Sequence, residues 1–341
     1  MKTIIKLVLL ATAMNLTTVA QDMNSVGQGS QMDRAGQTSM NFLQIGVSPK
    51  IAGRGNTTTA LGKGVESIFG NPAGLSEMST PFEAFMSVTQ WFADIRYLAG
   101  AVAWNSGSYG VFGVHFLSVD YGKIQGAVLT DPSVGEDNYI LTGDIPNVGA
   151  YSLGLSYVMQ VNPKFAIGGT VKYVAQQLGQ LSNSDGSLSD NNQGRIAFDL
   201  GLRYYFGWKS LNLAMTMRNF STFVRYQNQS FSLPIIYTIG AGLDVMDVLD
   251  PALAQDNSIL FSAEYVHPNN HSSRINTGFE YSYQKMFTLR AGYESNHDLL
   301  SLSFGAGISQ NLGDIRLEVD YSYSKVDLFG GVNRFSLNIG F

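Results

Sequence analysis

The sequence of 341 residues contains no cysteine, which restricts the chemistry open to it. Without a thiol, the chain cannot carry a lipid on cysteine, a disulfide framework or a thiolate metal site. Long hydrophobic runs are also missing. No stretch after residue 20 approaches the ~20 uninterrupted apolar residues of a membrane-spanning helix, which argues against a helical inner-membrane protein.

Charged residues are scarce as well. They make up 14% of the chain, compared with about 25% in ordinary soluble proteins. The net charge of −5 offers no basic surface for nucleic acid. Glycine (37), tyrosine (17) and phenylalanine (20) are abundant instead. Few charges and many aromatic rings are typical of a surface that faces lipid.

The last residues of the chain alternate strictly between apolar and polar side chains. Phe335, Leu337, Ile339 and Phe341 are separated by Arg334, Ser336 and Asn338 and by a glycine. Successive side chains of a strand point to opposite faces, so this strand has one apolar and one polar face. The pattern recurs in about fourteen segments from residue 81 onward, at ~18 residues per strand and turn. We therefore predict an all-β fold, a transmembrane antiparallel β-barrel of about 14 strands in the bacterial outer membrane.

The charged residues of these segments fall on the parity opposite to the apolar ones. A charge at the lipid midplane costs about 2–4 kcal/mol, so this parity assigns them to the lumen. Arg290 and Glu294 belong to the eleventh segment, and Arg316, Glu318 and Asp320 belong to the thirteenth. These two strands are not neighbours, so we expect contact across the lumen or through a plug. The terminal Phe341 is the predicted assembly signal for the barrel-assembly machinery.

Turn lengths predict the orientation. Counted back from Phe341, the short turns at Asn162-Pro163 and Gln284-Lys285 fall on the periplasmic side. The alternate set contains residues 122–147, an acidic stretch with Asp131, Glu136 and Asp137, and the polar residues 179–194. These longer connections are predicted extracellular loops. Residues 246–257 form a longer periplasmic connection that we expect to contain a short helix.

The N-terminal region divides into three parts. Residues 1–20 carry lysines, an apolar core and small residues at the end, as a secretory signal peptide does. Residues 21–40 are polar and rich in Gly, Gln and Ser, which predicts a flexible arm. Residues 41–80 form the predicted plug segment, and residues 81–341 form the barrel.

A series of motifs lies between the arm and the barrel. Residues 41–47 read Asn-Phe-Leu-Gln-Ile-Gly-Val, residues 51–55 read Ile-Ala-Gly-Arg-Gly, and residues 71–75 read Asn-Pro-Ala-Gly-Leu. In this order they resemble the start of the PorV/PorQ family of FadL-like outer-membrane barrels, and residues 198–202, 217–220 and 289–293 continue the resemblance. Two details depart from the family pattern: Gly70 replaces the usual aromatic residue, and Ala-Gly-Arg-Gly replaces the commoner Ala-Gly-Met-Gly-Gly. The motif residues of the predicted plug are Phe42, Leu43, Ile45, Gly46, Gly53, Gly55, Asn71, Pro72, Ala73, Gly74 and Leu75.

The resemblance implies a fourteen-stranded barrel whose N-terminal segment folds inward as a plug. The glycines in this segment permit close backbone packing, which agrees with that reading. The alternative is that residues 41–75 only cap the periplasmic mouth.

Three histidines allow either an enzymatic or a structural interpretation. His267, His271 and His297 fall in two predicted extracellular turns, where a metal or a catalytic group is conceivable. They are also ordinary turn residues, and no serine lies in a nucleophile-elbow motif. We therefore expect a non-enzymatic protein without a metal or another cofactor.

Two functions from different classes remain. The resemblance to PorV implies an interaction component of type IX protein secretion, with a large translocon barrel and the C-terminal domains of secreted proteins as partners. The alternative is a FadL-like transporter of small hydrophobic molecules. The charged lumen favours the first, because a path for apolar ligands should be lined mainly by apolar groups. A small apolar pocket formed by Phe42, Leu43, Ile45, Ile68 and Phe69 would favour the second.

Overall fold

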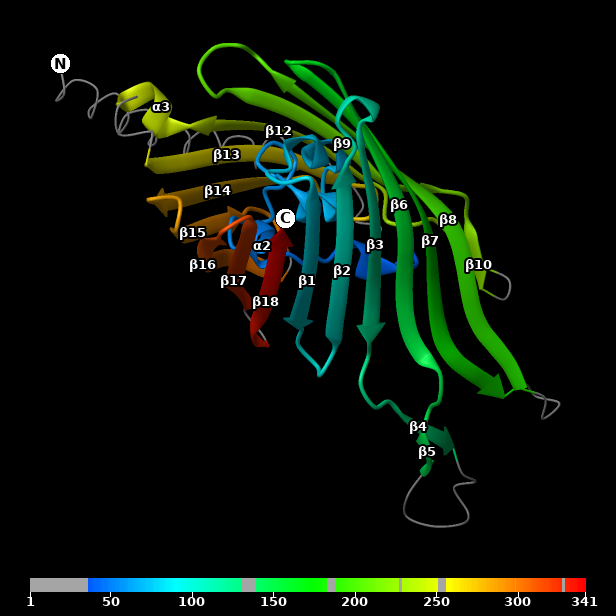
Figure 1. Ribbon diagram of the computed structural model, residues 1–341. Helices are drawn as coiled ribbons and strands as arrows, with labels where there is room; N and C mark the ends of the chain where they lie inside the picture. The colour runs from blue at the N-terminus through cyan, green and yellow to red at the C-terminus, as the bar shows by residue number, and fades with distance from the viewer. Residues whose placement is uncertain are drawn as a thin grey trace.

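Fourteen strands in the described part of the chain close into one antiparallel barrel (Figure 1). Each strand pairs with its neighbours in the chain, and the first strand pairs with the last. The barrel strands are β1 (Phe82–Gln90), β2 (Arg96–Asn105), β3 (Val111–Asp120), β6 (Val148–Asn162), β7 (Phe165–Ser182), β8 (Leu188–Tyr205), β9 (Asn212–Ser221), β12 (Ile236–Asp244), β13 (Asn257–Pro268), β14 (Arg274–Tyr283), β15 (Phe287–Glu294), β16 (Leu300–Leu312), β17 (Ile315–Val326) and β18 (Gly330–Gly340). The predicted fold class is confirmed.

This computed structural model describes residues 36–129, 139–182, 188–226, 229–250, 256–297, 299–326 and 329–341. The predicted signal peptide, most of the predicted arm, and Asp131, Glu136 and Asp137 lie outside these residues. Within the described ranges, no helix has the length and apolar character needed to cross a membrane.

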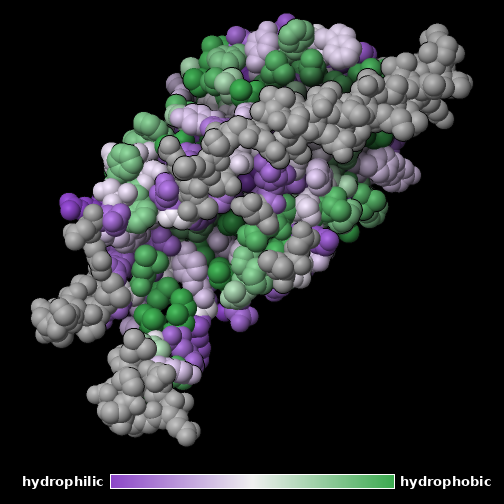
Figure 2. Space-filling view, turned by 180° about the vertical axis from the view of Figure 1, so that it is seen from behind, coloured by the Kyte–Doolittle hydropathy of each residue, from purple (hydrophilic) through white to green (hydrophobic). Residues whose placement is uncertain are grey.

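The alternation in the sequence becomes the two faces of the barrel wall. On β18, Phe335 and Leu337 are 50% and 42% exposed, whereas Arg334 and Ser336 between them are buried. The same alternation runs along β6, where the residues from Tyr151 to Met159 on the outer parity are exposed. Hydrophobic side chains gather in several clusters over the face seen in Figure 2, with hydrophilic residues between them. An apolar outer face on a closed sheet is the surface that an outer-membrane barrel presents to lipid.

The connections at the two ends differ in length. The turns beside Phe341 are short except for the one that contains the helix α3 (Val245–Leu249), as predicted. At the opposite end, two hairpins rise from the loops: β4 (Gln125–Leu129) with β5 (Tyr139–Asp144), and β10 (Val224–Tyr226) with β11 (Gln229–Phe231). The first of these projects well beyond the rim (Figure 1). We call the end that carries Phe341 the periplasmic end and the other the extracellular end.

The loop between β7 and β8 is shorter than the one predicted over residues 179–194. β7 and β8 continue to pair up to Ser182 and Leu188, so most of this polar stretch is strand. Backbone hydrogen bonds hold a hairpin together whether its side chains are polar or apolar. The polar composition therefore marks where the hairpin leaves the apolar band rather than where the strands end.

The chain between the arm and β1 forms short helical turns inside the ring of strands (Figure 1). They are η1 (Asn41–Gln44), α2 (Pro49–Ala52), η2 (Val65–Phe69) and η3 (Pro72–Glu77). α2 contacts β16 and β17, η2 contacts β1 and β2, and η3 contacts β6, β7 and β8. This inner segment, residues 41–78, therefore reaches several sides of the barrel wall.

Candidate functional site

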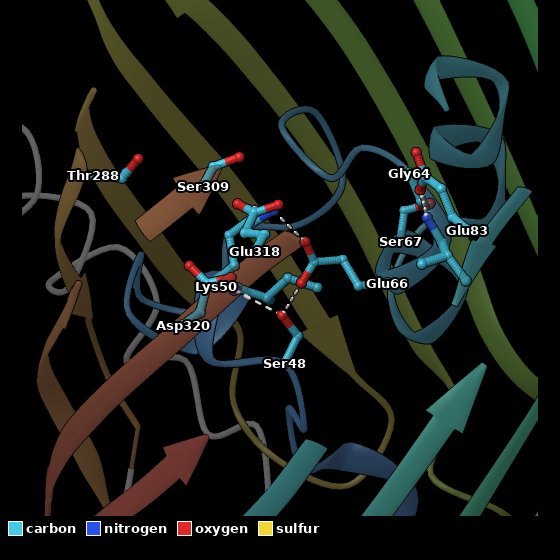
Figure 3. A network of polar contacts seen from close by, with 12 residues as sticks. Ser48, Lys50, Gly64, Glu66, Ser67, Glu83, Thr288, Ser309, Glu318 and Asp320 are labelled. Atoms are coloured by element: carbon cyan, nitrogen blue, oxygen red, sulfur yellow. Dashed lines mark hydrogen bonds and ion pairs between the residues drawn. The ribbon is translucent and has the colours of Figure 1, made fainter. Parts of the chain in front are cut away.

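The inner segment is tied to the barrel wall by ion pairs, and Lys50 is at the centre of one group. Its Nζ atom lies 2.6 Å from Glu66 Oε1 and 2.9 Å from Glu318 Oε1. Burial by itself disfavours the ammonium, but the carboxylates of Glu318, Glu66 and Asp320 outweigh that effect and raise the pKa of Lys50 above its ordinary value. Lys50 therefore stays charged and joins α2 to β17 (Figure 3).

Glu66 connects two parts of the inner segment. One of its oxygens binds Lys50, and the other accepts a hydrogen bond of 2.5 Å from Ser48 Oγ. Ser48 is also the N-cap of α2, where its hydroxyl accepts from the Ile51 N–H. The side chains of Ser48, Lys50 and Glu66 converge in Figure 3, which shows how α2 and η2 are held together.

A second ion-pair group lies at the end of η3. Arg203 of β8 and Tyr205 both contact Glu77 Oε1, and Lys63 Nζ lies 3.1 Å from Glu77 Oε2. Burial opposes ionisation of this carboxyl, but Arg203 and Lys63 outweigh it and hold the pKa of Glu77 below its usual range. This group fixes the C-terminal part of the inner segment just before β1.

Carboxylates of the β13–β15 wall hold the middle of the inner segment. Glu264 Oε1 accepts hydrogen bonds from the backbone N–H of Thr59 (2.6 Å) and Ala60 (3.2 Å). Asn56 Nδ2 donates to Glu294 Oε1 over 2.6 Å. The bonds to Glu264 satisfy backbone donors that the irregular segment cannot pair by itself, and the bond to Glu294 satisfies the Asn56 side chain.

The glycine-rich turn of the segment lies directly on the barrel wall. Gly55 has φ +65°, and a Cβ there would stand 2.7 Å from the backbone nitrogen of Tyr293. A Cβ on Gly53 would lie 3.1 Å from Cα of Gly305 on β16. At Gly55 both the positive φ and the close approach to the wall require glycine.

The remaining motif residues build the interior of the segment. Asn71 accepts from the Ala73 N–H and donates to the carbonyl of Thr59, and Pro72 begins η3. Gly46 accepts a hydrogen bond of 2.8 Å from Arg334 through its carbonyl. Two apolar clusters contain the larger side chains: Phe42 and Leu43 lie in one, and Leu75 lies in the other. Gly74 packs so closely on the Gly62 carbonyl and Ser67 that a Cβ would collide with them.

Four of the five predicted lumen charges belong to two ion-pair groups. Arg290 binds Glu280 (2.7 Å) and Asp320 (2.5 Å), and Arg316 lies 3.3 Å from Glu318. Glu294 binds Asn56 of the inner segment instead. The expectation of contact across the lumen or through a plug was wrong for Arg290 and Asp320, which meet directly over β16. Glu318 binds Lys50 of the inner segment, whose other ion-pair partner is Glu66 of the same segment.

Two cavities lie on opposite sides of the inner segment. The outer cavity, about 230 Å³, is lined by the segment and by residues of the extracellular turns, among them His271 and Leu299. The periplasmic cavity, about 670 Å³, is lined by Lys50, Arg54 and residues at the periplasmic end. The described residues that line one cavity do not line the other. The segment therefore separates them.

The predicted apolar pocket is present in part. Leu43, Ile45, Ile68 and Phe69 line a third cavity of about 30 Å³, but Phe42 packs elsewhere. The same small cavity is bounded by a buried cluster on the wall. Its members are His115, Lys172 and Asp199.

The turn histidines sit near the outer cavity. His297 Nδ1 accepts hydrogen bonds from the backbone N–H of Leu299 (3.1 Å) and Leu300 (3.2 Å), which requires that nitrogen to be unprotonated. Burial, Arg274 and His271 lower the pKa of His297 to about 3. His267 Nδ1 lies 2.8 Å from Ser273 Oγ. Among the described residues, no cluster of three or more His, Asp or Glu side chains is arranged to hold a metal ion.

Phe341 closes the seam of the barrel. Its backbone N–H and carbonyl pair with those of Phe82, both over 2.9 Å, and its ring stacks on the Phe82 ring at 5.6 Å between centroids. The side chain is 56% exposed on the outer face. It therefore lies at the junction of the first and last strands.

The sequence alone did not reveal that Lys50, Glu66 and Glu77 hold the inner segment in place. Each is a charged residue within an otherwise small and apolar segment. Only 14% of the residues in this chain are charged, so charged residues within such a segment could have indicated that they form ion pairs with the barrel wall.

No protein-family model and no curated protein matches the sequence. Solved structures do match. The Ralstonia pickettii toluene transporter TbuX superposes with a TM-score of 0.55 at 16% identity, covering 86% of this chain and 97% of that one. The Pseudomonas putida toluene transporter TodX gives 0.55 at 14% identity, covering 86% and 96%. A Pseudomonas aeruginosa FadL homologue gives 0.52 at 13% identity, covering 86% and 97%.

The fold is that of the FadL-like barrels. It places the chain in the bacterial outer membrane, as predicted. At these identities the likeness extends to the fold alone. The narrower resemblance to PorV/PorQ, which rests on the N-terminal motifs, stays a prediction.

Proposed function

We propose that this FadL-like barrel passes small, mainly apolar molecules across the outer membrane, with the outer cavity as their binding site. The observation that carries the proposal is that cavity. Apolar atoms, including those of Ile45, Phe69, Val266 and Leu300, make up the larger part of its lining surface, and fifteen of the lining residues carry a polar or charged side chain. Ligand sites in proteins are typically apolar with a small number of polar groups that orient the ligand.

The size of the outer cavity limits the ligand. At about 230 Å³ it exceeds the ~150 Å³ apolar cavity that accepts benzene in an engineered protein. It is smaller than the ~300–1,000 Å³ of sites for drug-sized molecules. A single ring with a short substituent fits these limits, which agrees with the toluene transporters among the similar structures.

Three inward-facing charged residues, Arg218, Glu264 and Arg274, line the outer cavity, and the other lumen ion pairs lie away from it. Arg290, Glu280 and Asp320 are paired with one another, and Lys50 is paired with Glu318. Arg290, Glu280, Lys50 and Glu318 line the periplasmic cavity rather than the outer one. Asp320 lines neither of the two cavities. No step of the proposed function involves catalysis, so we propose a non-enzymatic role.

The test uses cells with a lipopolysaccharide outer membrane that lack other barrels of this fold. Expression of the chain should increase uptake of radiolabelled toluene. Val266→Trp fills the outer cavity and should abolish the increase. Tyr265→Trp is the matched control, because Tyr265 lies on the same strand and is 46% exposed on the outer face. Uptake that is unchanged by Val266→Trp would refute the outer cavity as the route.

A second function, as an interaction component of type IX secretion, is supported by the N-terminal motifs. The dense ion pairing of the inner segment also favours it, since a rigid interior suits a docking protein better than a channel. Purification from detergent-solubilised outer membranes tests it. Co-purification of a very large barrel together with secreted proteins supports this function, and recovery of the barrel alone counts against it.

A further inference from the structure

Five oxygens of residues on the wall of the outer cavity are buried and lack a hydrogen-bond partner among the described residues. They are Asn56 Oδ1, Thr58 Oγ1, Thr59 Oγ1, Glu264 Oε2 and Asn276 Oδ1. Buried polar atoms in native proteins are nearly always hydrogen-bonded, and each exception calls for an explanation. Three of these atoms belong to the inner segment and two to the barrel wall, so they meet at the boundary between the two parts.

Glu264 stands out in this set. Its side chain is on β13, faces inward and is only 2% exposed. Oε1 is occupied by the backbone N–H of Thr59 and Ala60, which leaves Oε2 available. The carboxyl therefore has one oxygen that holds the inner segment and one that is free for a ligand.

The surroundings of Glu264 define the chemistry of that ligand. The inner segment contributes the apolar side chains of Ile45, Val47, Ile51 and Phe69 to the cavity wall, and the lining surface as a whole is more apolar than polar, so the body of the ligand should be apolar as well. A hydroxyl group both donates and accepts. It can therefore pair with Glu264 Oε2 whether or not the carboxyl carries a proton, and with the neighbouring threonine and asparagine oxygens.

A charged ligand fits less well. Arg218 and Arg274 line the cavity together with Glu264. A ligand ammonium would be repelled by the two guanidinium groups. A ligand carboxylate would be attracted by them but repelled by Glu264 if that group is ionised, and it would lose its hydration in the buried site. A neutral hydroxyl avoids these costs.

We propose that Glu264 makes the outer cavity selective for small apolar molecules that carry a hydroxyl, such as aromatic alcohols, over the corresponding hydrocarbons. The inference rests on the proposed function only in taking the outer cavity as the ligand site. A site built to pair with a hydroxyl rejects the analogue that lacks it, because its own buried oxygen would then stay unpaired.

The experiment compares benzyl alcohol with toluene as ligands of the purified full-length barrel in detergent, by isothermal titration calorimetry. Benzyl alcohol should bind about tenfold more tightly than toluene. Glu264→Met should reduce the ratio to about one. Glu264→Gln should preserve most of it, because the amide still pairs with a hydroxyl and its oxygen still accepts from Thr59 and Ala60.

Ser262→Ala is the matched control. Ser262 lies on the same strand with the same inward parity, and its Oγ is equally buried and lacks a partner in the described structure, but it does not line the outer cavity. It should leave the ratio unchanged. If the Glu264→Met variant does not fold, Thr58→Val takes its place in the binding experiment. It removes another of the five oxygens without changing Glu264 and should weaken benzyl alcohol binding but not toluene binding.

Equal affinity for the two ligands in the unmodified protein overturns the inference, and so does a ratio that survives Glu264→Met. The uptake assay separates this inference from the proposed function. A binding preference without uptake of either ligand refutes transport and leaves the selectivity of the cavity standing. Uptake of both ligands without a binding preference supports transport and refutes the selectivity of the cavity.

Discussion

Arg290 and Asp320 form an ion pair of 2.5 Å across a strand to which neither belongs. Arg290 is on β15 and Asp320 is on β17, with β16 between them. Gly305 and Gly307 of β16 face the two partners in the sheet register. Because these glycines have no side chains, the guanidinium reaches over the intervening strand to the carboxylate.

Gly307→Ala should therefore destabilise the barrel. A Cβ at this position collides with Asp320 Oδ1 and lies 2.9 Å from Arg290 Nη1, so the ion pair must move. We expect a loss of about 1–3 kcal/mol in the free energy of unfolding, as for other overpacked interiors. Urea unfolding in detergent, followed by tryptophan fluorescence, measures it.

Gly169→Ala on β7 is the control for that substitution. Its added Cβ meets only Leu200 and the Asp199 carbonyl, at 3.6 and 3.7 Å, which are ordinary contacts. It should change stability much less. Equal effects of the two substitutions would show that the space above β16 is not needed for the pair.

The inner segment should keep the barrel from conducting. Fourteen strands enclose more space than the ~8 whose side chains alone fill the interior, but fewer than the ~16–18 of open porins. Planar-bilayer recordings of the intact protein should show little steady conductance. Deleting residues 41–75 should raise it sharply, provided that the barrel still inserts. Large, stable channels from the unmodified protein would contradict this prediction.

Acid should loosen the C-terminal part of the inner segment. The folded-state pKa of Glu77 lies below its ordinary value of 4.5. The stabilisation from its ion pairs is therefore complete above about pH 4.5 and is lost as the pH falls through the depressed folded-state pKa. The thermal midpoint should drop in that acidic range in the unmodified protein.

In Glu77→Gln this part of the pH dependence should vanish, while the midpoint at neutral pH should be lower than in the unmodified protein. Differential scanning fluorimetry between pH 3 and pH 7 makes the comparison. An identical acidic drop in both proteins would show that other carboxylates are responsible.

The aromatic residue at the C-terminus should matter for assembly. Phe341→Ala removes the ring that stacks on Phe82 at the seam between β1 and β18. We expect a larger loss of inserted protein than for Phe335→Ala, a mid-strand residue of similar exposure on the same strand. Heat-modifiability on gels of outer-membrane fractions gives the folded fraction. Equal losses would mean that any aromatic residue of β18 serves assembly equally.

Much of the architecture follows from the sequence alone. The two-residue period of β18 and its counterparts determined the number of strands and which face meets lipid, because a charge on the wrong face is too costly in a membrane. The short helix α3 and the long loop that bears β4 and β5 were also predictable, since their connections depart in length from the neighbouring turns. The length of β7 and β8 was not, because polar side chains do not reveal where backbone pairing stops.

The partners within the lumen were decided by the tertiary structure. Lys50 meets Glu318, and Arg54 meets Glu280 over 3.1 Å, only because closure of the barrel brings distant strands around the inner segment. Arg290 reaches Asp320 because β16, the strand between them, has glycines at the two positions that face these residues. Parity places a side chain inside or outside, but it carries no information about which inward-facing group stands opposite. The unpaired oxygen of Glu264 in the outer cavity was also decided by the tertiary structure. The sequence determined that this carboxyl faces the lumen. Only the path of the inner segment decided that one of its oxygens is hydrogen-bonded and the other is not.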